Sequence, residues 1–258
     1  MYTAFASVYD RLMQSVDYEG WADYYARLLR GCGIEGGPVC ECACGTGSLT
    51  LTLRRRGYAM TGVDLSQEML SAAMQKTRAV GLQIPYVCQD MCRLQLHKRQ
   101  NAVLCTCDGL NYLTRPERVR AFLKAARNAL RPGGALIFDV STPYKLQNTL
   151  GDQTLGSLEE DIAYIWQNAW QPRSRTVSMR LSIFVREADG RYTRLEETQT
   201  QRAHTREELT RYLQETGFER VRFYGDRTLR APGAQAARWH VAAIRPKEKE
   251  HHDERDPI

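Results

Sequence analysis

Residues 39–48, VCECACGTGS, constrain the fold more than any other part of the chain. A short apolar run leads into a turn that contains Gly45 and Gly47, and a helical pattern follows at once. Glycines let the backbone bend sharply and approach a ligand closely. The free N–H groups at a helix start favour a carboxylate or a phosphate. The segment therefore predicts a buried strand, a ligand-binding turn and the N-terminus of a helix.

The first 140 residues alternate apolar runs with helical patterns. Helices are predicted at residues 1–31, 48–56, 67–80 and 116–130, and strands at 39–43, 59–63, 84–88, 102–107 and 135–140. Another predicted helix, 205–216, precedes two more predicted strands, 220–225 and 238–244. Strands separated by helices indicate a parallel sheet with helices on both faces. We therefore expect an α/β protein with a Rossmann-like, doubly wound, seven-stranded and mostly parallel sheet.

The pattern changes after the fifth of these strands. Residues 160–202 are rich in β-branched and aromatic side chains, and the alternation of Met179, Leu181, Ile183 and Val185 is typical of an antiparallel sheet with one covered face. We expect an N-terminal helical segment at 1–35, a core of 36–150 with 203–245, and an inserted antiparallel β subdomain at 151–202. The charged tail, 246–258, is predicted to be disordered.

The composition is that of an ordinary globular protein, with 43% hydrophobic and 26% charged residues. The net charge of +6 is scattered and by itself predicts no nucleic-acid partner. No apolar run could span a bilayer, and residues 1–21 lack the pattern of a secretory signal. The eight cysteines lack the Cys-x-x-Cys spacing of zinc sites. We expect a cytoplasmic protein with reduced thiols, no metal and no membrane partner.

Two acidic residues accompany the glycine turn. Asp64 ends the second predicted strand, where a carboxylate can accept hydrogen bonds from both hydroxyls of a ribose. Glu41 lies within the first strand and could receive the ammonium group of an amino-acid cofactor, or cap neighbouring backbone. The third glycine of the dinucleotide fingerprint would fall at Thr50, which disfavours NAD.

Five segments, in order, resemble the motifs of class I S-adenosylmethionine (SAM) dependent methyltransferases: ECACGTGSLT, GVDLSQEML, CQDM, CDGLNYL and LRPGGALIFDV. YTAFASVYDRLM and DVSTPYKL resemble a narrower group of small bacterial methyltransferases, which carry a late β-rich insertion and lack assigned substrates. Together the match spans roughly residues 1–245. Ala43 departs from the general motif, which has a glycine there, although the narrower group tolerates alanine. The resemblance implies SAM as cofactor and S-adenosylhomocysteine as product.

The resemblance also implies roles for individual residues. Residues around the methionine part of SAM are Glu41, Ala43, Cys44, Gly45 and Gly47. Residues around the ribose and adenine are Asp64, Leu65, Met69, Gln89, Asp90 and Met91. Residues beneath the sulfonium are Cys107, Asp108, Asn111 and Tyr112. Residues 1–35 would cover the pocket as a lid, with Tyr2 and Tyr9 two helical turns apart and their aromatic faces available to the sulfonium.

Methyl transfer from SAM is an in-line displacement that chiefly requires positioning and exclusion of water. A base is needed only when the nucleophile must lose a proton. The candidate catalytic residues are Asp108, Tyr112, Tyr144 and His204. Lys145 and Arg202 could bind substrate, whereas His204 could instead only cap the helix that follows it.

The acceptor is expected to be a small molecule. No Asn-Pro-Pro-Tyr-like segment follows the fourth strand and no Pro-Cys nucleophile is present, so methylation of DNA bases is disfavoured. No RNA-binding module is recognisable. Two alternatives stay open, a non-catalytic SAM-binding regulator or scaffold and an NAD-linked oxidoreductase. The insertion, with Trp166 and Trp170, could cap a substrate pocket, bind a partner or form a homodimer interface.

Overall fold

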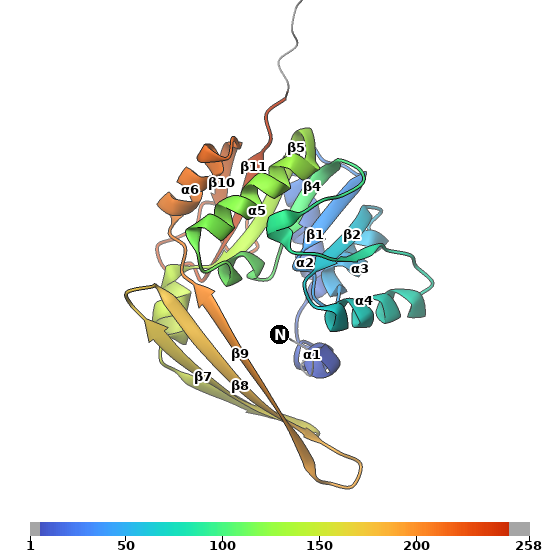
Figure 1. Cartoon of the computed structure of the whole chain (residues 1–258), viewed down its shortest axis with the longest axis vertical. Helices are drawn as coiled ribbons and strands as arrows, with labels where there is room; N and C mark the ends of the chain where they lie inside the picture. The colour runs from blue at the N-terminus through green and yellow to red at the C-terminus, as the bar shows by residue number, and fades with distance from the viewer. Residues whose placement is uncertain (1–5, 248–258) are drawn as a thin grey trace, which may run out of the picture.

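The computed structural model describes residues 6–247, and its centre is a seven-stranded sheet (Figure 1). The strand order is β10-β11-β5-β4-β1-β2-β3. The strands are β1 (Pro38–Cys42), β2 (Ala59–Asp64), β3 (Tyr86–Cys88), β4 (Gln100–Cys105), β5 (Leu130–Ser141), β10 (Glu219–Tyr224) and β11 (Arg238–Ile244). Strands β1 to β5 pair in parallel, and β11 is antiparallel to both its neighbours. The expected Rossmann-like α/β fold is confirmed.

Helices cover both faces of this sheet. They are α2 (Tyr18–Gly31), α3 (Ser48–Arg55), α4 (Gln67–Ala79), α5 (Pro116–Ala129) and α6 (Arg206–Glu215), whereas α1 (Ala6–Leu12) packs against α4 and residues of the insertion. An apolar cluster on one face joins the sheet to Phe122 of α5 and Leu213 of α6, and a second cluster joins it to Leu29 of α2 and Leu53 of α3. The central strands are therefore buried on both sides, which explains their unbroken apolar runs.

Several boundaries differ from the sequence-based expectation. Between residues 6 and 31 the expected single helix is wrong, because α1 and α2 are separate and the Asp17 side chain caps α2 by accepting a hydrogen bond from Gly20 N at 2.8 Å. The strand expected at 102–107 stops at Cys105 because Cys107 and Asp108 have left-handed φ angles of 53° and 64°. Three short helices were not predicted: η1 (Met91–Arg93), η2 (Gly109–Tyr112) and the π-helical η3 (Lys145–Leu150).

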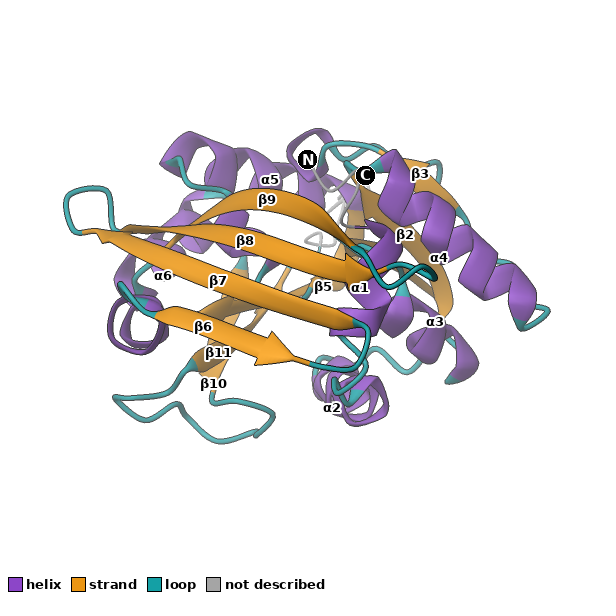
Figure 2. Cartoon of the chain, turned by 90° about the horizontal axis from the view of Figure 1, so that it is seen from below, coloured by secondary structure: helices purple, strands orange, loops and turns teal. Residues whose placement is uncertain are grey.

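A second sheet of four antiparallel strands forms a separate layer (Figure 2). Its strands are β6 (Thr154–Leu158), β7 (Ile162–Gln171), β8 (Thr176–Arg186) and β9 (Tyr192–Arg202). An antiparallel sheet was expected here, but β6 was not identified in the sequence. The inner face is the side of this sheet on which Ile183 packs against Val8 of α1, and Met179 packs against Leu146 of η3. This sheet therefore lies against elements that border the carboxyl ends of the core strands.

Within residues 6–247, no helix combines the length and the apolar character needed to cross a bilayer. No group of three or more His, Cys, Asp or Glu side chains in the same part of the chain is arranged to hold a metal ion. The eight cysteines all lie in this part and are free thiols.

Candidate cofactor and methyl-transfer site

The glycine turn lies at the carboxyl end of β1, between β2 and β4 in the sheet. Ligands of open α/β sheets bind at this edge. Gly45 has a φ of 54°, and a Cβ built there would meet no atom of residues 6–247 within 4 Å apart from its chain neighbours. Gly47 has a φ of 70°, but a Cβ there would lie 2.7 Å from Tyr86 Oη. Gly45 thus borders open space that a ligand can fill, whereas Gly47 permits close internal packing.

Asp64, at the end of β2, holds this turn in place. Its carboxylate accepts hydrogen bonds from Gly45 N at 2.8 Å and from Ser66 N at 3.0 Å. An ionised carboxylate has about four acceptor sites, so capacity remains for the hydroxyls of a ribose. The adjacent Leu65 is 66% exposed, which leaves an apolar surface beside the carboxylate for a flat ring.

Glu41 lies on β1 beneath the turn and is 1% exposed. Thr106 Oγ1 donates to Glu41 Oε1 at 2.5 Å, and Thr50 Oγ1 donates to Glu41 Oε2. Burial raises the pKa of the Glu41 carboxyl to about 7, although the two threonine hydrogen bonds oppose the rise. Among the described residues, the recorded partners of Glu41 are these two threonine side chains, so the expected alternative of a backbone cap is not observed. Because its pKa is about 7, a bound cation beside Glu41 would favour the charged form of the carboxyl.

The third predicted motif lies on the other side of β2. Asp90 accepts hydrogen bonds from Cys92 N at 2.9 Å and from Arg118 Nη1 and Nη2 at 2.8 and 3.1 Å. Burial alone would raise the pKa of Asp90, but these hydrogen bonds and the Arg118 charge hold it below its usual value. Gln89 Oε1 accepts from Gln95 N at 2.9 Å. Sequence reasoning missed Arg118, which sits on α5 outside every motif.

The two methionines of the predicted adenine pocket are mostly buried. Met91 is 9% exposed and packs in the apolar cluster of α5. Met69 is 2% exposed and packs with Val8 of α1, and with Ile162 and Ile183 of the four-stranded sheet. Met69 therefore joins α4 to the N-terminal helix and to the insertion, which the sequence did not indicate.

A buried polar network fixes the turn after β4. Cys107 N and Asp108 N donate to the carboxylate of Asp139 at 2.7 and 3.1 Å, and Tyr25 Oη donates to it at 2.6 Å. Arg238 pairs with Asp139, which is fully buried, and with Asp108 at 2.6 Å. The network stabilises two successive left-handed residues, a conformation that costs energy outside glycine. Tyr25, Asp139 and Arg238 carry no sequence signal for this role.

Asp108 is the candidate base most firmly held by its neighbours. Its carboxylate accepts a hydrogen bond from Ser141 Oγ at 2.9 Å and pairs with Arg238 Nη1 at 2.6 Å. Lys145 Nζ lies 4.0 Å from the same carboxylate. Burial would raise the pKa of Asp108, but the Arg238 and Lys145 charges outweigh that effect and lower it. A carboxylate so strongly paired is a weak proton acceptor.

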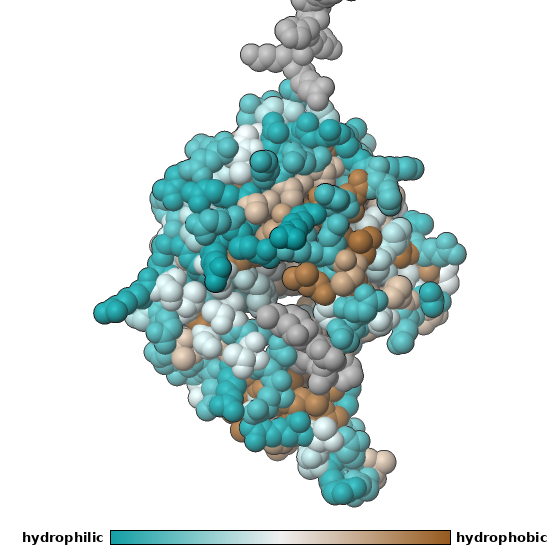
Figure 3. Space-filling model, in the orientation of Figure 1, coloured by the Kyte–Doolittle hydropathy of each residue, from teal (hydrophilic) through white to brown (hydrophobic). Residues whose placement is uncertain are grey.

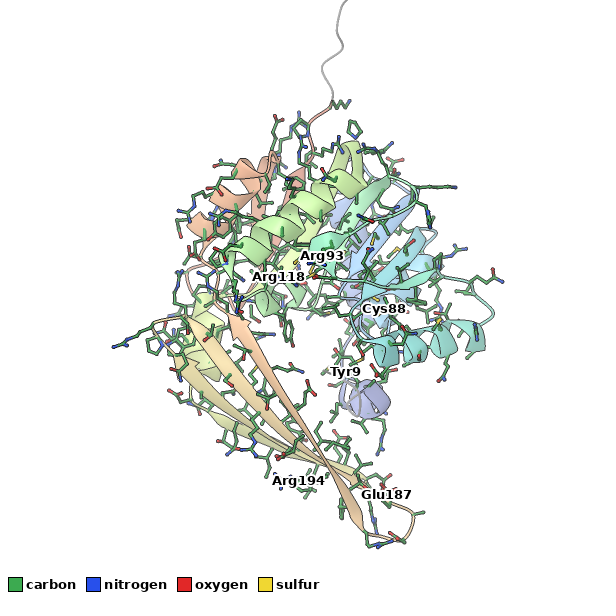
Figure 4. All side chains as sticks on the ribbon, in the orientation of Figure 1. Tyr9, Cys88, Arg93, Arg118, Glu187 and Arg194 are labelled. Atoms are coloured by element: carbon green, nitrogen blue, oxygen red, sulfur yellow. The ribbon has the colours of Figure 1, made fainter. Side chains whose placement is uncertain are left out.

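Tyrosines gather around the exposed Cys107. Tyr9 lies on the side of α1 that faces the core (Figure 4). Burial, followed by the neighbouring Tyr18 and Cys107, raises the pKa of the Tyr9 hydroxyl well above its usual value. Burial and then Cys107 likewise raise the pKa of Tyr18, a residue that sequence reasoning missed. Tyr112 Oη donates to Gln199 Oε1 of β9 at 2.7 Å. The predicted Tyr2 lies outside the described residues.

The other predicted residues lie at the joint between core and insertion. The Asn111 amide donates to Ser141 O at 3.0 Å and to Arg202 O at 2.9 Å, and it accepts from Ser141 N. His204 is completely buried, with its Nδ1 3.1 Å from Arg202 Nη1. Burial and then Arg202 lower the pKa of His204 to about 4, so the imidazole is neutral. Tyr144 is half-buried, directly before η3.

Comparisons with known proteins identify the family of the chain. Residues 39–134 match the family model described as a methyltransferase domain. The chain is 36% identical over 248 residues to "Putative methyltransferase YqeM" of Bacillus subtilis (strain 168), covering 96% of this chain and 98% of that protein.

Solved structures extend the likeness to three dimensions. A SAM-dependent methyltransferase from Clostridium acetobutylicum superposes with a TM-score of 0.86 at 30% identity, over 96% of this chain and 99% of that one. CalS10 of Micromonospora echinaspora, an amino pentose methyltransferase solved with SAM, shares the fold at 22% identity, with a TM-score of 0.73 over 95% and 98% of the two chains. The open space at Gly45 beside the Asp64 carboxylate fits SAM. The chain therefore belongs to the class I SAM-dependent methyltransferases.

Proposed function

We propose that this methyltransferase acts on a small molecule bound between its glycine turn and the inner face of the four-stranded sheet. The observation that carries the proposal is the open space at Gly45 together with the position of α1: Thr46 Oγ1 of the glycine turn donates to Asp10 of α1 at 2.6 Å, and α1 packs against the four-stranded sheet. Figure 3 shows the surface hollowed where the core and the sheet face each other. A site enclosed from two sides favours a small acceptor over a long polymer.

In this proposal the cofactor lies along the carboxyl edge of the core. SAM supplies an electrophilic methyl group on a sulfonium. Asp64 would hold the ribose, Leu65 and Met91 would border the adenine, and Glu41 would attract the ammonium. Asp90 is already paired with Arg118, so it would meet the adenine amino group alongside that guanidinium. Tyr9 and Tyr18 would remain neutral and present aromatic faces to the sulfonium, which such faces stabilise.

The catalytic role of the chain is chiefly to position the acceptor and to exclude water. Tyr112 and Tyr144 stay in the proposed set because both are half-buried. Tyr112 ends η2, directly after the turn that follows β4, and Tyr144 precedes Lys145, whose Nζ lies 4.0 Å from Asp108 of that turn. Asp108 would position that turn through Arg238 rather than remove a proton. His204 is not retained as a group in contact with substrate, because its imidazole has no exposed surface.

A test of the acceptor site uses the full chain, SAM and a panel of metabolites of graded size. We expect small molecules to raise the release of S-adenosylhomocysteine, and a short oligonucleotide or peptide to leave it unchanged. Stimulation by the polymers alone would overturn the proposal. Tight SAM binding without turnover of any panel member would instead favour a regulator.

Binding of SAM should depend on pH through Glu41. Because the pKa of Glu41 is about 7 without SAM, the carboxyl is protonated in acid and cannot attract the ammonium. SAM affinity is expected to fall about tenfold from pH 8 to pH 6. Titration calorimetry at several pH values measures this change. Glu41→Gln should bind weakly with a flat profile, and a flat profile in the natural protein would contradict the assignment.

Two alanine substitutions in the glycine turn should have opposite consequences. Gly45→Ala places a methyl group in the open space and meets no atom of residues 6–247 within 4 Å. Apart from the strain of about 1–2 kcal/mol that alanine carries at a φ of 54°, the protein should keep its fold, but it should bind SAM at least roughly tenfold more weakly. Gly47→Ala drives a Cβ to 2.7 Å from Tyr86 Oη and should lower the melting temperature. Calorimetry and thermal unfolding separate the two. Equal effects on both measurements would show that the two glycines do not differ as described.

A further inference from the structure

The inner face of the four-stranded sheet carries a polar strip between its two apolar ends. Strand pairing places Trp166, Leu181 and Glu197 in one row across β7, β8 and β9. The next row consists of Asn168, Met179 and Gln199. Facing residues in a row point to the same side of a sheet. The acidic and amide side chains of these two rows therefore point toward the core, with Leu181 and Met179 between them.

Glu197 is the one charged residue among the inner-face positions of β7, β8 and β9. Its side chain is partly buried, and no cation of residues 6–247 lies within ion-pair distance of it. Its neighbour Glu196 points to the outer face, where it pairs with Arg180 and Arg194. A carboxylate that is partly desolvated without a partner is costly, because burial weakens its hydration. Glu197 thus offers an unused negative charge to the inner face.

Asn168 gives a second, independent sign of a ligand. The residue is 8% exposed, and neither Nδ2 nor Oδ1 has a hydrogen-bond partner among residues 6–247. Trp166 Nε1, two residues earlier on the same face, is also buried and has no partner in the described part of the chain. Nearly all buried polar side-chain atoms in proteins are hydrogen-bonded. The unpaired donors Asn168 Nδ2 and Trp166 Nε1 and the unpaired acceptor Asn168 Oδ1 therefore point to a ligand that offers a neutral polar group at this position.

The strip lies next to tyrosines that the proposed function places around the sulfonium. Tyr112, which follows β4 beneath the expected sulfonium, donates to Gln199 of the second row. On the other side, Tyr9 of α1 packs in the cluster that contains Leu181 and Leu195, the strand neighbours of Glu197. Tyr9 is also close enough to Tyr112 and Cys107 for each to affect the pKa of its hydroxyl. Glu197 is therefore flanked by the tyrosines that surround the methyl position.

We propose that Glu197 and Asn168 select an amine as the methyl acceptor, Glu197 by binding its ammonium form and Asn168 by binding a neighbouring hydroxyl or amide. The inference rests on the function proposed above and names its substrate class. Before transfer, the ammonium releases one proton to solvent. The nitrogen lone pair then forms the N–C bond as the C–S bond breaks, and the electron pair of that bond stays on sulfur. The products are a methylated ammonium and S-adenosylhomocysteine.

The test uses probes of matched shape on the full chain: trans-4-aminocyclohexanol, cyclohexylamine, cyclohexanol and cyclohexanecarboxylate. Ligand-detected NMR with S-adenosylhomocysteine present measures binding, and release of S-adenosylhomocysteine from SAM measures turnover. We expect both amines to bind at least about tenfold more tightly than cyclohexanol, and only the amines to be methylated. The aminocyclohexanol should bind most tightly. Equal binding of cyclohexanol, or preference for the carboxylate, would overturn the proposal.

Three variants assign the preference to residues. Glu197→Gln should raise KM for the amine probes at least about tenfold, with a smaller change in kcat and an unchanged affinity for SAM. Glu196→Gln, the same change on the outer face, should alter neither. Asn168→Leu should lose the extra affinity for the aminocyclohexanol. It should also raise the melting temperature by a few degrees, because an unsatisfied amide is removed.

The outcomes separate this inference from the proposed function. If S-adenosylhomocysteine binds and a small non-amine is methylated at the site, the proposed function stands and the amine assignment fails. If Glu196→Gln changes amine binding as much as Glu197→Gln, the effect comes from the net charge of the protein and not from a contact with Glu197. The amine assignment then also fails. If no small molecule is methylated although S-adenosylhomocysteine binds, both proposals fail together.

Discussion

Asp64→Ala should lower the affinity for SAM by more than about tenfold while the fold survives. The substitution removes the acceptor proposed for the ribose hydroxyls. It also frees Gly45 N and Ser66 N, which donate to this carboxylate at 2.8 and 3.0 Å. The glycine turn would then lose the side chain that holds its shape. Titration calorimetry with SAM measures the loss, and circular dichroism checks the fold.

A conservative variant separates charge from shape at the same position. Asp64→Asn keeps one carbonyl oxygen, which can still accept from Gly45 N, and should lose less affinity than Asp64→Ala. Asp23→Ala provides a distant control, since Asp23 pairs with Arg56 on the surface of the core. That control should bind SAM as the natural protein does. An unchanged affinity in Asp64→Ala would remove Asp64 from the site.

The parts of the fold that sequence predicts well are those set by local physical chemistry. Residues 39–48 predict the strand, the turn and the helix start because glycine spacing and an apolar run act over a few residues. The start of α6 is equally local, since Thr205 and Glu208 form a reciprocal cap at the start of the helix predicted over 205–216, although the cap residue is Thr205 and not His204. The seven core strands could be located because each is marked by its own apolar run. The predicted ends of these strands differ from the observed ends by one to several residues.

The parts that sequence does not predict depend on contacts between distant residues. Asp139 receives hydrogen bonds from Tyr25 and from the backbone of Cys107, and it pairs with Arg238. These partners lie on α2, the turn after β4, and β11, so no spacing rule connects them. Asn111 matched a cofactor motif, yet its amide joins β5 to the end of β9. A motif identifies a position, whereas the neighbours of its side chain depend on the whole fold.

The stability of the core should depend strongly on Arg238. Its guanidinium contacts the carboxylates of Asp139 and Asp108, and the side chain of Asp139 has no exposed surface. Arg238→Met would leave the fully buried carboxylate of Asp139 facing the partly buried one of Asp108, with Lys145 Nζ 4.0 Å from Asp108 as the nearest other cation recorded for the described residues. Removing one partner of a buried ion pair typically costs about 3–5 kcal/mol. We expect the melting temperature to fall by roughly 6–20 °C.

A second substitution distinguishes charge imbalance from lost packing in that variant. Asp139→Asn in the Arg238→Met background removes one of the two uncompensated charges, so part of the lost stability should return. Arg191→Met removes an arginine from the exposed pair with Asp189 and should leave the melting temperature unchanged. Thermal unfolding of the four proteins measures both effects. If Arg191→Met and Arg238→Met proved equally harmless, the left-handed turn at Cys107 and Asp108 would be held by the backbone hydrogen bonds to Asp139 alone, and Arg238 would make no contribution to stability.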